Sequence, residues 1–281
     1  MRFAFLLESR RAIARVTAET MQRLRERGAH VDVLFGPDST RVVDLSALRP
    51  EYDVYVLKSK SPLTHSLAGA IEASGGCVVN SHASSVLTWD KVATTGVLAA
   101  AGIPVPMSWA AGTPQMLTTP LECGPLWFKP QHGKSGAGVR RVDEASALDE
   151  GSTPVLDAFG FQLPVFAQRD VPSAGTDFKV YAIGDRLWSL VKQWPPRGPD
   201  GKLGVRVDLP DSIAETALNV GFLLGLEVYG VDFLLPTDGS PPVVIDVNAF
   251  PGYNGLAEAP EVLATHLFDC ARRQQQVRAL A

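Results

Sequence analysis

Cysteine is scarce in this chain: only three occur among 281 residues, at positions 77, 123 and 270. An odd number of widely spaced cysteines gives neither a disulfide framework nor a zinc-binding spacing, so we expect a reducing, cytoplasmic setting. Long apolar runs are lacking as well. The segment FAFLL near the N-terminus is too short for a signal peptide, and no run approaches the ~20 residues that span a bilayer.

An excess of positive charge is also missing. The chain has 26 lysines and arginines against 30 aspartates and glutamates, a formal net charge of −4. This balance gives no general attraction to nucleic acid or to a membrane surface, so neither is expected as a partner. Internal repeats and low-complexity segments are absent from the sequence. The composition, 46% hydrophobic, is typical of one to three globular domains and leaves a homo-oligomer open.

Strand and helix patterns alternate in the first part of the chain, which favours a parallel α/β sheet. Strands are expected over 2–8, 30–35, 52–58 and 77–80, with helices over 13–28 and 65–76. One further helix over 88–102 leads to short strands with glycine turns, and then to longer antiparallel strands. We therefore predict three domains: an N-terminal α/β domain, a central α+β lobe and a C-terminal α+β lobe, over residues 1–85, 86–165 and 166–281.

The segment GVDFLLPTDGSPPVVIDVN has the turn chemistry of a hairpin at its centre. If the hairpin is symmetric about Gly239, Asp232 lies opposite Asp246, and Asn248, two residues further on, shares their face. Two facing carboxylates would repel, so we expect one of them to take up a proton unless a cation lies between them. Oxygen ligands of this kind suit Mg²⁺. The alternative is an edge hairpin from which both aspartates point to solvent.

A glycine-rich turn follows a strand in the segment WFKPQHGKSGAGV. Lys129 ends the strand, and the glycines at 133, 136 and 138 could expose backbone N–H groups to phosphate oxygens. The spacing does not match a P-loop, and no helix follows as a dinucleotide fingerprint requires. The alternative is an ordinary hairpin turn.

Five segments in order resemble ATP-grasp enzymes: WDKVATTGVLAAAGIPVP, LWFKPQHGKSGAGVRRV, DFKVYAIG, YGVDFLL and VIDVNAFPG. The resemblance covers roughly residues 80 to 256. It implies two α+β lobes that clasp ATP, preceded by a small parallel α/β domain, with ATP and Mg²⁺ as cofactors. The metal ligands would be Asp232, Asp246 and Asn248, although the second acid is more often Glu in this family.

The resemblance also implies a set of nucleotide-binding residues. Lysines would contact the phosphates, the glycine loop would close over them, and the backbone of a hinge segment would read the adenine. The set comprises Lys91, Lys129, Lys179, the loop residues His132, Gly133, Lys134, Ser135, Gly136 and Gly138, and the hinge residues Gln168, Arg169, Asp170 and Val171.

Two branches of the superfamily compete for the reaction. The segments DKVATTGVLAAAGIPVP and KPQHGKSGAGV resemble glutathione synthetase and ribosomal-protein glutamate ligases, which form an acyl phosphate and then an amide. The segments YDVYVLKSK and VIDVNAFPGYNG resemble inositol-phosphate kinases, which phosphorylate a hydroxyl group. The ligases' Arg-x-Asn and Gly-Gly pattern is missing from GKLGVRVDLP, and a tryptophan stands where the kinases usually have an arginine. We rank ligase first, kinase second, and a nucleotide-binding pseudo-enzyme or sensor third.

An anionic small molecule or peptide is the expected substrate. Lys58 and Lys60 share a face at the carboxyl end of a strand in the parallel block, where ligands of open α/β sheets bind. The Pro251-Gly252 turn is expected to lead the chain, through Tyr253 and Asn254, along the acceptor side of the substrate site. The predicted substrate contacts are Arg10, Arg11, Lys58, Lys60, Trp194 and Gly252, and the predicted catalytic residues are Lys179, Lys192 and Arg206. The alternative for each basic residue is a solvated surface position.

Overall fold

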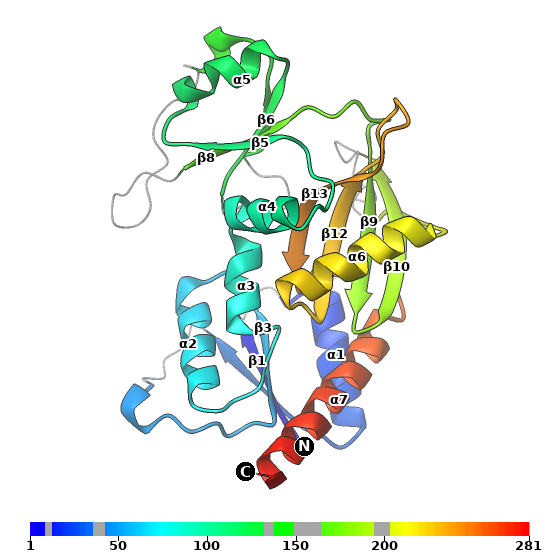
Figure 1. Ribbon diagram of the computed structural model, residues 1–281. Helices are drawn as coiled ribbons and strands as arrows, with labels where there is room; N and C mark the ends of the chain where they lie inside the picture. Colours follow the sequence, from blue (N-terminus) through cyan, green and yellow to red (C-terminus); the bar gives the residue numbers. More distant parts are fainter. Residues whose placement is uncertain (9–12, 36–42, 132–137, 149–163, 194–202, 281) are drawn as a thin grey trace.

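The computed structural model describes residues 1–8, 13–35, 43–131, 138–148, 164–193 and 203–280. The N-terminal domain is a parallel sheet in the order β2-β1-β3-β4, seen at the lower left of Figure 1. Its strands are mostly apolar and buried, as expected when helices cover the faces of a parallel sheet. The elements are β1 (Arg2–Leu7), α1 (Arg15–Glu26), β2 (His30–Phe35), a 3₁₀ turn (Leu45–Ala47), β3 (Val54–Lys58), α2 (Pro62–Ala73) and β4 (Val78–Val79).

The expected helix over 88–102 is two helices, α3 (His82–Trp89) and α4 (Lys91–Ala100). Asp90 breaks the run because its backbone is extended and its side chain caps α4, accepting from the N–H groups of Val92 and Ala93. Leu98 of α4 is buried in the core beneath α6. This stretch, which we assigned to the central lobe, therefore packs on the C-terminal sheet.

The central lobe is an antiparallel sheet in the order β5-β8-β6-β7, at the top of Figure 1. One face buries a small core of its own with α5 and the flanking 3₁₀ turns. Its last strand, β8, spans the boundary predicted at residue 165, so the central sheet continues to Arg169. The elements are β5 (Ser108–Ala111), a 3₁₀ turn (Pro114–Leu117), α5 (Thr118–Glu122), β6 (Leu126–Lys129), β7 (Arg140–Val142), a 3₁₀ turn (Ala145–Leu148) and β8 (Val165–Arg169).

The C-terminal lobe is an antiparallel sheet in the order β11-β10-β9-β12-β13. Alternate residues such as Phe178 and Val180 of β9 pack beneath α6. The opposite face is apolar at one end, where it packs against α7 together with the N-terminal sheet, and polar at the other. The elements are β9 (Thr176–Ile183), β10 (Arg186–Gln193), β11 (Val205–Val207), α6 (Asp211–Leu224), β12 (Val228–Leu234), β13 (Val243–Ala249) and α7 (Ala259–Leu280).

Helix α7 is the longest helix among the described residues, and it lies beside α1 with the two chain ends near each other (Figure 1). Polar and charged residues recur between the apolar residues along α7. Within the described residues no helix is both long and apolar enough to cross a membrane.

Candidate nucleotide and metal site

The predicted acidic pair lies on the polar end of the C-terminal sheet. Asp232 of β12 pairs with Asp246 of β13 on one side and with Lys179 of β9 on the other. Because directly paired residues of an antiparallel sheet point to the same face, the three side chains form a row, and Asn248 extends it by two residues. The prediction of the hairpin register is confirmed.

Each carboxylate of the row is paired with a lysine. Lys179 donates to Asp232, and Lys91 of α4 donates to Asp246; these four side chains are between 13% and 28% exposed. Asn248 Nδ2 also donates to Asp246 Oδ2 at 3.1 Å. Burial alone would raise the pKa of Asp246, but the ammonium groups of Lys91, Lys129 and Lys179 together outweigh burial, so the pKa lies below its usual value. The expectation that one of the two facing carboxylates takes up a proton without a cation is therefore not met at Asp246.

Lys91 owes its position to the start of α4. Asp90 Oδ2 accepts a hydrogen bond from Gln131 Nε2 at 2.8 Å, while Oδ1 caps the helix. Gln131 directly precedes the glycine-rich loop. The same aspartate thus fixes the helix that carries Lys91 and the chain that enters the loop.

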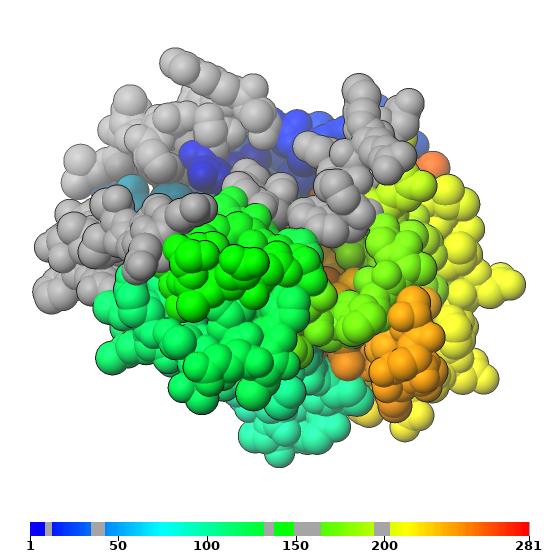
Figure 2. Space-filling model, turned by 90° about the horizontal axis from the view of Figure 1, so that it is seen from above, coloured from blue at the N-terminus to red at the C-terminus, as the bar shows by residue number. Residues whose placement is uncertain are grey.

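Lys129 lies where the central sheet meets the C-terminal sheet. Its ammonium group donates to the side-chain oxygen of Gln168 and, at 3.1 Å, to the carbonyl of Ile245 on β13. Burial lowers the pKa of Lys129 to about 8. Seen from above in Figure 2, the central lobe (green) lies beside β9 and β10 (yellow-green) and the β12–β13 turn (orange). The predicted phosphate lysines therefore come from both lobes.

The sequence analysis missed two polar residues of the same face, Asp177 and Tyr181 on β9. Burial and the Asp232 carboxylate raise the pKa of Asp177 to about 6. The hydroxyl group of Tyr181 accepts a hydrogen bond from Lys192 Nζ at 3.0 Å, and burial lowers the pKa of Lys192 to about 8. The signal for Asp177 was its place two residues before Lys179, which puts it on the same strand face.

In the predicted hinge segment 168–171, the side chains of residues 168 to 170 form hydrogen bonds to other parts of the protein. Gln168 is 2% exposed and holds Lys129. Arg169 faces the other side of the central sheet, where it donates to the carbonyl of Pro120 at 2.6 Å. Asp170 accepts from Arg141 at 3.2 Å. The backbone N–H groups of residues 169 and 170 donate to carbonyls at 2.8 and 2.9 Å. Adenine binding by the backbone of this segment, which ends at Val171, stays a prediction.

The predicted substrate lysines line a cavity that also contacts Lys91 and Asn248. Lys58 and Lys60 line it from the carboxyl end of β3, together with Glu8 and Phe250. Lys58 also donates to the carbonyl of Phe250. The N-terminal domain and the C-terminal sheet thus share this cavity.

Two further residues that were expected at the site, Tyr253 and Arg206, do not line it. Tyr253 is fully buried and donates through its hydroxyl to the carbonyl of Ala182 at 2.7 Å, so the expectation that it lies along the acceptor side is wrong for this side chain. Arg206 is exposed on the edge strand β11 and forms an ion pair with Glu258 at 2.6 Å. Gly252, in the turn between Phe250 and Tyr253, is partly exposed.

Several predicted residues lie outside the described residues. Gly138, with φ +74°, begins the described chain after the glycine loop. The residues outside are Arg10, Arg11, His132, Gly133, Lys134, Ser135, Gly136 and Trp194.

Comparison with known proteins gives relatives and a fold. No family model matches the chain. A Shewanella loihica (strain ATCC BAA-1088 / PV-4) protein named "Probable alpha-L-glutamate ligase" is 27% identical, with 85% of this chain and 86% of that protein covered. A Klebsiella pneumoniae (strain 342) protein of the same name is 25% identical, with 92% and 93% covered.

The solved structures agree on the fold. D-cycloserine synthetase DcsG superposes with a TM-score of 0.73 at 19% identity, covering 98% of this chain and all of that one. A RimK domain ATP-grasp protein of Sphaerobacter thermophilus DSM 20745 gives 0.72 at 19% identity, covering 95% of this chain and all of that one. The predicted fold class is confirmed. The chain has the fold of these ATP-grasp structures, and its sequence is similar to proteins named as probable alpha-L-glutamate ligases.

Proposed function

We propose that the protein is an ADP-forming carboxylate–amine ligase that uses ATP and Mg²⁺ and forms an acyl phosphate. The observation that carries the proposal is the row on the C-terminal sheet, in which two carboxylates are each paired with a lysine, Lys179 with Asp232 and Lys91 with Asp246. Relatives named as glutamate ligases support this reaction class. The solved neighbours include an ATP-grasp ligase, PsnB, in complex with a minimal precursor, Mg and ADP.

The donor set fits magnesium. Asp232, Asp246 and Asn248 offer two carboxylates and one amide oxygen on one face of the sheet, and Mg²⁺ prefers such hard oxygen ligands. When bound, Mg²⁺ would supply positive charge that neutralises the transferring phosphoryl group. The ammonium groups of Lys91 and Lys179 are already within reach of the same carboxylates, so they can turn to phosphate oxygens once the carboxylates have another cation to bind.

The chemistry proceeds in two transfers. A carboxylate oxygen of the substrate attacks the γ-phosphorus of ATP, and the bond to the bridging oxygen breaks, which releases ADP. An amine then attacks the acyl carbon, phosphate leaves, and the amine loses a proton. We place the acid in the cavity next to Asn248, because Lys58 and Lys60 give it positive charge. Lys192, on the same sheet face as Lys179, is proposed to act on the developing charge. We propose no role in this step for Arg206, which is paired with Glu258 on the exposed edge strand.

The experiment that tests this function is a product analysis. The protein is incubated with ATP, Mg²⁺ and panels of amino acids, dipeptides and inositol phosphates, with hydroxylamine present in a parallel series. ADP with free phosphate and a new amide, and a hydroxamate in the parallel series, is the expected result. ADP with a phosphorylated alcohol and no free phosphate would instead identify a kinase.

A further inference from the structure

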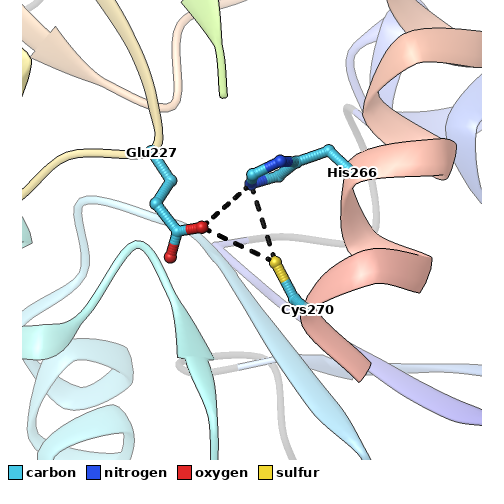
Figure 3. Close-up of side chains that lie close together, drawn as sticks. All are labelled: Glu227, His266 and Cys270. Carbon is cyan, nitrogen blue, oxygen red and sulfur yellow. Dashed lines mark hydrogen bonds and ion pairs between the residues drawn. The ribbon is translucent and has the colours of Figure 1, made fainter. Parts of the chain in front are cut away.

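A second polar cluster lies at the opposite end of β12 from Asp232. Glu227 directly precedes β12, and His266 and Cys270 lie one turn apart on α7 (Figure 3). The three donor atoms face one point: His266 Nε2 is 3.2 Å from Glu227 Oε2 and 3.6 Å from Cys270 Sγ, and Sγ is 3.8 Å from the same Oε2. None of these residues takes part in the nucleotide site.

These distances match the edges of a metal tetrahedron. Zinc binds nitrogen and oxygen ligands at about 2.0 Å and sulfur at about 2.3 Å, so tetrahedral angles place N and O about 3.3 Å apart and sulfur about 3.5 Å from either. The observed edges of 3.2, 3.6 and 3.8 Å are within about 0.3 Å of these values. The three side chains therefore need little movement to bind one ion.

The surroundings orient the donors toward that point. A Cβ added to Gly184 would lie 3.2 Å from His266 Nδ1, so the turn between β9 and β10 contacts that side of the ring and Nε2 points to the cluster. Cys270 is 2% exposed, whereas the Glu227 side chain is 45% exposed. An ion would thus reach a buried thiol past a carboxylate at the surface.

Arg273 is the competing partner. Its Nη2 lies 2.7 Å from Glu227 Oε2 and 3.2 Å from Cys270 Sγ, so a guanidinium group balances the carboxylate in this state. The arginine side chain is 56% exposed and can turn to solvent when another cation enters.

We propose that Glu227, His266 and Cys270 bind a borderline-soft divalent cation of the zinc type, which fastens α7 to the start of β12. A thiolate and an imidazole select zinc or cobalt over magnesium, so this ion is distinct from the one proposed beside ATP. Binding replaces the thiol proton and leaves the fourth position to water or another donor. The spacing of the cysteines gave no sign of the site, since only one of the three ligands is a cysteine and Glu227 lies 43 positions before it.

The test is a metal titration of the full chain, stripped with chelator and free of nucleotide. Zinc binding is followed by calorimetry, and cobalt binding by absorption, in which a thiolate-to-metal charge-transfer band reports bonding to sulfur. We expect one ion per chain with that band. Cys270→Ala and His266→Gln should each weaken zinc binding by about 100-fold or more, while Arg273→Ala should tighten it.

Cys123→Ala is the matched control, because this cysteine is exposed in the central lobe, and its zinc affinity should equal that of the parent. Circular dichroism establishes that each variant is folded. A cobalt complex without the charge-transfer band would overturn the proposal for the unmodified chain, whatever the variants do. Equal zinc affinity of Cys270→Ala and the parent would overturn it as well.

Discussion

At the scale of single residues, the site balances its charges before any ligand binds. Asp246 is held by Lys91, a residue 155 positions earlier in the chain, and Asp232 is held by Lys179 on the neighbouring strand. Strand periodicity and hairpin symmetry could predict that the two aspartates face each other. They could not predict Lys91 as a partner, because that contact depends on how α4 packs against the sheet.

Asp246→Asn keeps the shape of the side chain and removes its charge. We expect turnover to fall by about 100- to 1,000-fold, as for the loss of one group that stabilises transition-state charge, with the fold intact. Initial rates of ADP formation at limiting and saturating Mg²⁺ measure the effect. Asp238→Asn, in the exposed turn of the same hairpin, is the control and should retain parental rates. Near-parental activity of Asp246→Asn at limiting Mg²⁺ would contradict the metal assignment.

Lys129 should take up a proton when nucleotide binds. Burial lowers its pKa to about 8, so near pH 8 a substantial fraction is uncharged, and phosphate oxygens should restore the charge. Calorimetry of Mg-ATP binding in two buffers of different ionisation enthalpy measures the uptake. Lys129→Ala should reduce the uptake and weaken binding by about 10- to 100-fold, whereas Lys60→Ala should leave nucleotide affinity unchanged. Parental affinity of Lys129→Ala would refute the nucleotide assignment.

Asp177 should make the ligand-free protein less stable as pH rises. Its folded pKa is raised to about 6 from about 4 in the unfolded chain. The folded state therefore holds this proton more tightly, and its contribution to stability is present below pH 4 and lost by about pH 6. Asp177→Asn should lack this loss, so its free energy of unfolding relative to the parent should rise by about 1–2 kcal/mol between pH 4 and 7.

Denaturant unfolding at several pH values tests the role of Asp177. Asp185 lies in the exposed turn between β9 and β10. The free energy of unfolding of Asp185→Asn should show the same pH dependence as that of the parent. If Asp177→Asn showed the same pH dependence of stability as the parent, the surroundings of Asp177 would not raise its pKa.

At the scale of elements, local patterns predicted the hairpins well and the packing less well. The pairing of Asp232 with Asp246 agreed with symmetry about Gly239, whereas the register shift between Asp232 and Phe233 was not predicted. The break between α3 and α4 was missed, since Asp90 lies inside an otherwise helical pattern and only its capping bonds reveal it. Tyr253 was misplaced because a glycine-rich turn indicates a loop but not which of its side chains enters the core.

The cap of α4 should link stability to nucleotide binding. Asp90→Ala removes the capping bonds and the bond to Gln131, so we expect a loss of about 1–2 kcal/mol of stability and weaker nucleotide binding, because Lys91 is no longer held. Asp44→Ala is the control: Asp44 caps the 3₁₀ turn Leu45–Ala47 and should leave nucleotide affinity unchanged. Equal effects of both variants on affinity would argue against a positioning role for Asp90.

At the scale of the whole molecule, the N-terminal sheet, the C-terminal sheet, α1 and α7 share one core, whereas the central lobe has its own small core. The central lobe meets the rest through polar contacts such as Lys129 with Ile245 and Lys91 with Gln131. The lysines predicted to bind phosphate and the acidic row thus lie at the junction of two separately packed bodies. This arrangement suits a site whose two sides close on a nucleotide.

The central claim is that a carboxylate of the substrate becomes an acyl phosphate. Once a substrate acid is identified by product analysis, the acid is labelled with ¹⁸O in its carboxylate and turned over with ATP, Mg²⁺ and the amine. The account predicts one ¹⁸O atom in the inorganic phosphate released, because the attacking carboxylate oxygen leaves with the phosphorus. Inorganic phosphate without label, or a phosphorylated product in place of free phosphate, would contradict it.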